Sequence, residues 1–509
     1  MIKDPSATKE TNKLIGYIAM PSSSYLEYRW TLPFLFGAMV FAYSMSNFAN
    51  YVLSDPDTFM HIASGWWMME HHQVPSIDPF SYNTNGLKWI AHEWLAQIMM
   101  AISYDWAGFY GLRILVAGLF SLTIGYQLAF LLNRMPAIYA IFLSVLCFAS
   151  LLGHHLARPH IFTWPILLIW LAVLINKVDE GHWKAPYYLT PLMVLWANLH
   201  GSFILGLMTI PFFGLEACLN AEKDHKKKTL GSWVLFLILS FSCSLITPYG
   251  VEGILFGTHL VSAQFTSSII EWVPASGYSL LPIEYWVILI IFMGLTGYLR
   301  LPVIRILLLV GFIHESLAHV RYISILGLVT PLLIAKSFGD LYRQKHATIN
   351  PERIQWNDWF STDNVGKRVT IFTCVLIVLA LTIFAARMYQ QNILDPVTAP
   401  EAAIEYAKTE GLNGNVLNYY NMGGYLIYKQ IPVIIDGRAD LYGQSKIDEY
   451  FSILNLENES NINSYLSDHQ ISWTIFPPAE KIVLYLNSQP KWQKVYEDKY
   501  AVIHAHQKN

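Results

Sequence analysis

The sequence predicts a polytopic α-helical membrane protein that ends in a soluble α/β domain. Three observations lead to this fold class. Only 14% of the 509 residues are charged and 54% are hydrophobic, whereas soluble domains carry about 25% charged residues. The apolar residues gather in runs, many of them of roughly 17 to 25 residues, a length that crosses a bilayer as a helix. After residue 387 these runs end, and the composition becomes that of a soluble protein.

Apolar runs predict about eleven membrane spans. They cover residues 31–52, 113–132, 136–152, 161–176, 187–199, 201–219, 230–247, 285–299, 302–315, 321–336 and 369–386. The run 94–104 is shorter, and we expect it to form a helix at the membrane interface. Residues 1–30 are then a cytoplasmic segment, and residues 31–386 form a bundle whose first outer loop, 53–112, is large.

The basic residues favour this topology. Cytoplasmic loops collect Lys and Arg. With eleven spans and a cytoplasmic N-terminus, the run KDHKKK at 223–228 and the loop from Lys336 to Arg368 lie inside. Counting 94–104 as a further span would place KDHKKK outside. The C-terminal residues 387–509 are therefore expected outside the cytoplasm.

Residues 387–509 predict an extracytoplasmic α/β domain. TAPEAAIEYAKTEG has the pattern of a helix that begins after a proline and ends at a glycine. GNVLNYY, GGYLIYK, IPVIID, SWTIFPP and YAVIHAH are typical of short strands separated by turn residues.

Polar residues collect on the outer side of this topology. The first outer loop carries Asp55, Asp57, His61, His71, His72, Asp78, His92 and Glu93. The other outer segments carry GHHLARPH at 153–160, NLHG at 198–201, ITPYG at 246–250, EW at 271–272 and HESLAHVR at 314–321. Ionisable groups near a membrane are energetically expensive and usually mark a functional site. Loops that converge on one face therefore predict a single site.

The segment SDPDT allows two interpretations. Asp55 can cap a helix, Pro56 suits the first helical position, and Asp57 complements the positive helix end. Capping alone needs one carboxylate, however, and His61 and AHEW at 91–94 stand nearby. Two carboxylates two residues apart can also hold a divalent cation such as Mg²⁺ or Mn²⁺, or divide the roles of base and metal ligand.

Several motifs resemble those of one family. DPDTFMHI at 55–62, VPSIDPFSY at 74–82 and LARPH at 156–160 resemble outer-loop motifs of the GT-C superfamily of membrane glycosyltransferases. NYYNMGGYLIYKQIPVIIDGR at 418–438 resembles a loose version of the oligosaccharyltransferase WWDYG region. Tyrosines and an asparagine replace its tryptophans and aspartate, which argues against acceptor recognition of the sequon type.

The resemblance implies a GT-C-like enzyme of the bacterial inner membrane. It would transfer a sugar, with inversion, from a polyprenyl-phosphate donor to an acceptor on the outer face. Asp55 and Asp57 are then the catalytic carboxylates, with Asp57 favoured. The departing phosphate needs positive charge, for which Arg158, Arg321 and His61 are candidates. The expected partners are the lipid-linked sugar and membrane lipid; the acceptor is not identified, and no nucleic acid is expected.

Further outer residues are candidates for acceptor binding or auxiliary roles. They are His92, Glu93, His314, Glu315, Tyr420 and Asp436. Asp436 has a second interpretation, because IDGRADLYG at 435–443 also fits an internal salt-bridged turn of Asp436, Arg438 and Asp440. His200, beside Gly201, is interpreted as a break between two spans rather than as a ligand.

Other function classes remain open on the sequence. A transporter or lipid flippase needs charged residues inside spans and discontinuous helices at mid-bilayer. A non-catalytic scaffold for envelope assembly is a further alternative. A zinc protease is disfavoured, because the histidines of HESLAH at 314–319 are separated by about 140° around a helix.

Overall fold

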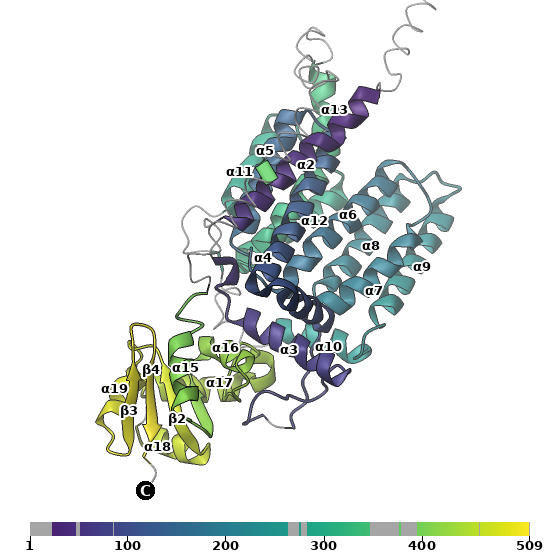
Figure 1. Cartoon of the computed structure of the whole chain (residues 1–509). Helices are drawn as coiled ribbons and strands as arrows, with labels where there is room; N and C mark the ends of the chain where they lie inside the picture. Colours follow the sequence, from purple (N-terminus) through teal and green to yellow (C-terminus); the bar gives the residue numbers. More distant parts are fainter. Residues whose placement is uncertain are drawn as a thin grey trace, which may run out of the picture.

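The structure is a computed structural model that describes residues 23–46, 51–84, 86–262, 274–275, 282–346, 376–377, 394–457 and 459–507. Long helices form a bundle, and residues 394–507 form a smaller mixed unit at one end of it (Figure 1). Helix α3 (Asp57–His71) lies between the two parts (Figure 1). We call residues 394–507 the C-terminal unit.

The bundle contains helices from α2 to α13. They are α2 (Ser23–Met45), α4 (Trp94–Leu132), α5 (Ala137–Leu152), α6 (Thr163–Asp179), α7 (Thr190–Leu199), α8 (Phe203–Asn220), α9 (Lys226–Ser244), α10 (Val251–Ser262), α11 (Pro282–Leu295), α12 (Val303–Ala318) and α13 (Tyr322–His346). Short 3₁₀ turns, η2 (Pro159–Phe162) and η3 (Tyr187–Leu189), precede α6 and α7.

Length and composition identify four helical stretches of the described chain that could cross a membrane. They are Trp94–Leu132, Pro159–Asp179, Phe203–Asn220 and Tyr322–Lys345. Thr31–Met45, Ala137–Leu152 and Pro282–Leu295 are apolar but shorter. The helical membrane class therefore agrees with the sequence prediction. The number of eleven spans stays a prediction, and the span predicted at 369–386 lies outside the described residues apart from 376–377.

The first helix ends earlier in the chain than predicted. The span expected at 31–52 ends at Met45, where α2 ends. Arg113 of α4 donates from Nε to the Ser44 carbonyl at 3.0 Å and from Nη2 to the Ser46 carbonyl. These bonds satisfy carbonyls that a helix end leaves without an intrahelical partner. A buried arginine from another helix thus stabilises the end of α2.

Helix α4 contains a break that separates two segments. Ala107 (φ −151°, ψ 29°) and Gly108 (φ 59°, ψ −146°) both leave helical geometry. Gly108 adopts a left-handed φ that glycine accepts without steric penalty. The predicted helix over 94–104 is therefore present as a separate segment before the break, and the predicted span at 113–132 follows it.

The C-terminal unit is built on a four-stranded mixed sheet. Its strands are β1 (Asn415–Asn418), β2 (Ile471–Phe476), β3 (Trp492–Glu497) and β4 (Val502–His506), in the order β1-β2-β4-β3. β1 pairs parallel to β2, while β4 pairs antiparallel to β2 and β3.

Helices cover both faces of this sheet. α15 (Glu401–Thr409) and α16 (Gly423–Tyr428) pack on the face that carries Trp473 and Ile475. α17 (Ala439–Leu454), α18 (Glu459–Asp468) and α19 (Lys481–Ser488) cover the opposite face. Phe59, Met60 and Ala63 of α3 belong to the first of these hydrophobic clusters. The first outer loop therefore supplies part of the core of the C-terminal unit.

Three of the five predicted strands are confirmed. GNVLNYY, SWTIFPP and YAVIHAH contain β1, β2 and β4, and the predicted helix is α15. GGYLIYK is instead helix α16, and IPVIID contributes only a single bridge between Val433 and Ser81. β3 was not predicted. The apolar residues of α16 are buried all round, so the helix lacks the polar face that produces a 3.6-residue pattern.

Aromatic residues join α16 to the first outer loop. The Tyr428 ring stacks on Trp66 of α3 at a centroid distance of 5.5 Å. The hydroxyl groups of Tyr428 and Tyr104 are 2.5 Å apart. Because Tyr104 lies on α4, these contacts connect three elements that the sequence separates widely.

Candidate functional site

Asp55 and Asp57 lie at the start of α3. The helix begins at Asp57, one residue later than predicted, with Pro56 at the N-cap. Asp55 Oδ1 accepts a hydrogen bond from the Asp57 backbone N–H at 2.9 Å. Asp55 therefore caps a free N–H at the helix start, which is one of the two interpretations of the sequence.

Both carboxylates face Arg158, which follows α5. Arg158 Nη2 is 2.6 Å from Asp57 Oδ2, and Nη1 is 3.4 Å from Asp55 Oδ2. The side chains of Asp55 and Asp57 are 8% and 15% exposed, and that of Arg158 is 25% exposed. Two candidate catalytic residues and a candidate phosphate-binding residue thus form one partly buried ionic site.

Backbone contacts hold Arg158 in this position. Ala157 donates its N–H to the Val52 carbonyl at 2.8 Å, and the Thr58 hydroxyl donates to the Ala157 carbonyl at 3.0 Å. Pro159 restricts the preceding residue to extended geometry, and Arg158 has φ −130° and ψ 159°. The loop is therefore fixed against the segment that carries the aspartates.

The C-terminal unit approaches the aspartates closely through two glycines. A Cβ added to Gly437 would lie 1.7 Å from Asp57 Oδ1, and one added to Gly424 would lie 2.2 Å from the Pro56 carbonyl oxygen. Neither position admits another residue without movement of its neighbour. Tyr420 is also close to Asp57: burial, and then the charge of Asp57, raise the pKa of its phenol well above the usual value.

A second cluster surrounds Glu93. The Nε2 atoms of three histidines converge on its carboxylate, at 3.3 Å for His200, 3.6 Å for His92 and 3.9 Å for His61. The Glu93 side chain is 15% exposed. His200 lies at the break between α7 and α8, as predicted, and contacts the cluster as well. Its role beside Glu93 was not predicted.

The tautomer of His200 follows from its backbone contact. The Ser202 N–H donates to His200 Nδ1 at 3.0 Å, so Nδ1 acts as the acceptor. The neutral ring must then carry its proton on Nε2, the atom that faces Glu93. His200 is thus a donor toward the carboxylate, and a second proton on Nδ1 would displace the Ser202 bond.

Electrostatics distinguish the three histidines. Burial lowers the pKa of His61 and of His200 to about 4, against the opposing effect of Glu93. The positive charge of Arg158 lowers both further, and Arg321 acts on His200. These couplings place both arginines in the electrostatic environment of the Glu93 cluster.

His92 behaves differently from its neighbours. Burial opposes its charged form, but Glu93 and then Asp440 hold the pKa of His92 above its usual value. The histidines in turn hold the pKa of Glu93 well below its usual range, despite burial. Burial raises the pKa of Asp440, which His92 opposes. Asp440, at the start of α17, was expected only as a member of a salt-bridged turn, and its effect on His92 was not predicted.

Asp436 belongs to a buried ionic network rather than to an open site. Its Oδ2 accepts from Arg438 Nη2 and from the Tyr442 hydroxyl, both at 2.6 Å. Arg438 Nη1 is 2.6 Å from Asp78 Oδ1 of the first outer loop. The salt-bridged turn proposed for this segment is therefore present, and it extends to Asp78. This network, not an exposed acceptor contact, accounts for Asp436.

His314 and Glu315 differ from these clusters in their exposure to solvent. Both side chains are exposed on α12, whereas the residues around Glu93 are largely buried. Arg321, seven residues beyond His314, precedes α13. The structure thus links the Arg321 end of this outer segment to the site electrostatically.

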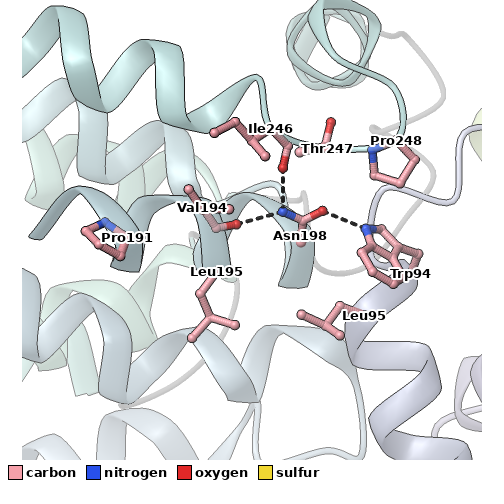
Figure 2. Close-up of a pocket in the computed structure, with 9 residues that line it drawn as sticks. All are labelled: Trp94, Leu95, Pro191, Val194, Leu195, Asn198, Ile246, Thr247 and Pro248. Carbon is pink, nitrogen blue, oxygen red and sulfur yellow. Dashed lines mark hydrogen bonds between the residues drawn. The ribbon is translucent and has the colours of Figure 1, made fainter.

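An apolar groove of about 530 Å³ adjoins the Glu93 cluster (Figure 2). Its lining is Trp94, Leu95, Pro191, Val194, Leu195, Asn198, Ile246, Thr247 and Pro248. Asn198 accepts from Trp94 Nε1 at 2.8 Å and donates to the Val194 and Ile246 carbonyls at 2.7 and 2.8 Å (Figure 2). Trp94 directly follows Glu93 in the chain, so the lining of the groove is adjacent to the Glu93 cluster.

The aspartates do not fit the divalent cation that the sequence suggested. Arg158 already faces one oxygen of each carboxylate. The other oxygen of Asp55 caps a backbone N–H, and that of Asp57 lies against Gly437. Within the described ranges, no group of three or more His, Cys, Asp or Glu side chains is arranged to hold a metal ion. The metal role expected for Asp55 and Asp57 is therefore not supported.

Comparison with known proteins identifies the fold. No protein-family model matches the sequence, and no curated protein matches it. The archaeal oligosaccharyltransferase of Archaeoglobus fulgidus, solved with a tethered acceptor peptide, matches with a TM-score of 0.52 and 10% identity, over 88% of this chain and 69% of that chain. ArnT from Cupriavidus metallidurans, bound to undecaprenyl phosphate, matches with a TM-score of 0.49 and 16% identity, over 94% and 98%. Both are GT-C glycosyltransferases. The match to the archaeal oligosaccharyltransferase, at 10% identity, shows a likeness of fold alone.

Proposed function

We propose that this protein is a membrane glycosyltransferase that moves a sugar from a polyprenyl-phosphate donor to an acceptor. The observation that carries the proposal is the 2.6 Å contact between Arg158 and Asp57. It joins a group suited to a leaving phosphate with a group suited to an incoming nucleophile. The fold shared with an oligosaccharyltransferase supports the same class of reaction.

The reaction is a single displacement with inversion. The acceptor hydroxyl or amide attacks the anomeric carbon while the bond from that carbon to the phosphate oxygen breaks. Asp57 accepts the proton of the acceptor. The polyprenyl phosphate leaves with the bonding electron pair, so a second carboxyl acid is not required. In this scheme Asp57 is the catalytic carboxylate and Asp55 positions it through the cap.

Arg158 stabilises the negative charge that develops on the leaving phosphate. A guanidinium carries five N–H donors in a rigid plane and can bind two oxygens of one phosphate. Because Arg158 also contacts Asp57, donor phosphate and catalytic carboxylate would be aligned by one side chain. Arg321 adds positive charge farther along the same face, where it already influences His200.

The apolar groove is suited to the isoprenoid chain of the donor. Leu95, Val194, Leu195 and Ile246 line it, and it adjoins the polar cluster through Glu93 and Trp94. A lipid that carries a phosphate headgroup has this division into an apolar and a charged part. In our proposal, the chain of the donor lies in the groove and its phosphate lies toward Arg158.

The C-terminal unit covers the reacting groups. Gly437 lies against Asp57, and Tyr420 is near it with a phenol that stays protonated. A protonated phenol can donate a hydrogen bond to the acceptor or to the sugar. We propose that the site lies outside the cytoplasm of a bacterial inner membrane, with the bundle over 31–386 and the C-terminal domain over 387–509.

A transporter is less well supported by the charges of the described bundle. Arg305 of α12 is 2.5 Å from Asp179 and 2.9 Å from Glu216. This buried trio is mutually paired, as expected of a structural network. The residues around Asp57 and Glu93 likewise lie at helix ends and loops, so neither cluster supplies the mid-span charges that a transporter needs.

The test is transfer from a defined donor. Purified protein in lipid nanodiscs is given synthetic polyprenyl-phosphate sugars, and release of polyprenyl phosphate is followed by mass spectrometry. We expect release with wild-type protein and with Asp448→Asn, an exposed carboxyl of α17. Asp57→Asn should release almost none. Equal release by Asp57→Asn and Asp448→Asn would refute the assignment of the site.

A further inference from the structure

We infer that the guanidinium of Arg158 takes the place of a divalent cation at the Asp55–Asp57 pair, so that transfer at this site needs no bound metal. The functional half of this inference rests on the proposed glycosyl transfer. The structural half is the claim that Arg158 prevents a metal ion from binding to the Asp55–Asp57 pair, and it rests on contacts alone.

The oxygens of Asp57 are both engaged. Oδ2 is 2.6 Å from Arg158 Nη2, a distance typical of a strong charge-assisted hydrogen bond. Oδ1 lies so close to the backbone of Gly437 that an added Cβ would be 1.7 Å away. A cation on Asp57 would therefore have to displace either the arginine or the C-terminal unit.

The oxygens of Asp55 are engaged as well. Oδ1 accepts from the Asp57 N–H at 2.9 Å and so caps α3. Oδ2 faces Arg158 Nη1 at 3.4 Å. Mg²⁺ and Mn²⁺ need several oxygen ligands in a near-octahedral arrangement. The pair has no carboxylate oxygen that is directed away from these partners to begin such a shell.

The backbone that carries Arg158 is held on both sides. Hydrogen bonds at 2.8 and 3.0 Å fix Ala157 to Val52 and Thr58, and Pro159 restricts the backbone on the other side. A cation at the aspartates would lie directly beside this fixed positive charge, and like charges at such distances repel strongly when partly buried. The same charge already disfavours protonation of His61 and His200.

A guanidinium can perform the functions that a metal cation would have in this reaction. A metal in phosphoryl or glycosyl transfer neutralises the leaving phosphate and orients it. Arg158 offsets one of the two negative charges of the aspartates in the resting site and presents planar N–H donors suited to phosphate oxygens. It keeps its charge at any working pH, because arginine is not deprotonated in proteins.

Direct metal binding tests the structural half. The whole protein in nanodiscs of zwitterionic lipid is titrated with Mn²⁺, and free Mn²⁺ is counted by its electron paramagnetic resonance signal. We expect wild type, Asp57→Asn and Asp55→Asn to bind the same number of Mn²⁺ ions. One ion bound by wild type and lost in both variants would overturn the inference, whether or not the protein shows transfer activity.

A gain of Mn²⁺ binding on removal of the arginine is a second test of the structural half. Arg158→Ala should acquire one Mn²⁺ ion that wild type lacks, and Arg158→Ala/Asp57→Asn should lose it again. Arg343→Ala is the matched control, because Arg343 is also 2.6 Å from an aspartate, Asp340, but on an exposed surface. Failure of Arg158→Ala to bind the extra ion would overturn the claim that the arginine occupies a cation position.

The functional half is tested by chelation. Release of polyprenyl phosphate by wild type should change less than twofold after treatment with EDTA. A loss of tenfold or more that Mn²⁺ or Mg²⁺ restores would overturn the inference and leave the proposed function intact. Absence of release under every condition would instead refute the proposed function, while the Mn²⁺ titrations would still decide the structural half.

Discussion

Gly437 lies so close to Asp57 that a single added methyl group would overlap the carboxylate, with its carbon 1.7 Å from Oδ1. The two residues are separated by most of the chain. Their contact means that the C-terminal unit completes the surroundings of the candidate catalytic carboxylate.

Gly437→Ala should therefore impair both docking and transfer. The added Cβ must push apart α3 and the Asp436–Arg438 turn, and overpacking of this kind costs about 1 to 3 kcal/mol. We expect a lower melting temperature and a strong loss of turnover. Gly231→Ala is the control, because a Cβ there meets nothing within 4 Å. Wild-type turnover in Gly437→Ala would show that this approach has no functional role.

Asp57→Asn should abolish transfer while the fold is retained. A positioned base contributes roughly 10² to 10⁴ in rate, and asparagine cannot accept the proton. The pair with Arg158 is only partly buried, so the loss of stability should be small, on the order of 1 kcal/mol. Release kinetics and thermal melting measure the two effects. If Asp55→Asn and Asp57→Asn both kept full activity, helix capping would explain the aspartates completely.

Arg158→Lys should lower kcat far more than it changes KM for the donor. A lysine keeps the charge but loses the planar fork that grips two phosphate oxygens. The charge on the leaving phosphate is greatest in the transition state, so the effect should appear mainly in turnover. We expect a loss of about 3 kcal/mol, on the order of a hundredfold in kcat. Steady-state kinetics with a synthetic donor test this prediction. An unchanged kcat would mean that Arg321, and not Arg158, binds the phosphate.

Glu93→Gln should destabilise the protein more at low pH than at high pH. The pKa of His92 is raised by Glu93, so its contribution to stability is present below the unfolded value of about 6.5 and is lost as pH rises through the raised pKa. The pKa of Glu93 is lowered, so its own contribution is present above its unfolded value of about 4.3 and is lost only in stronger acid.

The window for this test therefore begins above the unfolded pKa of glutamate, about 4.3, and extends upward past the unfolded pKa of histidine, about 6.5. The difference in melting temperature between wild type and Glu93→Gln should be largest near pH 5.5 and should shrink toward pH 8.5. Glu70→Gln, an exposed change on the same loop, should show no such trend. A difference that grows with pH would contradict the charge arrangement around Glu93.

Arg438→Met should detach the C-terminal unit from the first outer loop. Loss of this guanidinium leaves Asp78 and Asp436 buried without their ionic partner, which costs roughly 3 to 5 kcal/mol. Increased proteolysis of residues 394–507 and a lower melting temperature are the measurements. Lys494→Met removes an exposed ion pair with Glu497 and should change stability by less than about 1 kcal/mol. Similar effects of both substitutions would contradict the role of Arg438 as a connection.

Local patterns located several residues of the site in advance. Asp55, Asp57, His61, His92 and Glu93 stood out because ionisable side chains are rare beside apolar spans. Arg158 stood out for the same reason, and the structure pairs it with Asp57. The contact of Gly437 with Asp57 and the effects of Asp440 and His200 on the Glu93 cluster were missed, because each depends on segments that are distant in the sequence.

The strands show the same division between local and distant information. β1, β2 and β4 were predicted, because apolar and β-branched residues between turn residues are a local signal. GGYLIYK was mistaken for a strand, because α3 and the sheet enclose α16 and remove any polar stripe. A short apolar segment can be a helix or a strand, and only its neighbours in space decide which.

The sequence by itself determined that this chain is a helical membrane protein whose C-terminal part differs from the rest in composition. Hydrophobic run length and the scarcity of charge are properties of continuous segments, so they can be read without a structure. Only the tertiary structure decided that Arg158 closes the aspartate pair, that Glu93 gathers three histidines, and that Gly437 lies on Asp57. Each of these contacts joins segments that are distant in the sequence. Its contribution to stability depends on the distance between the atoms and on their burial.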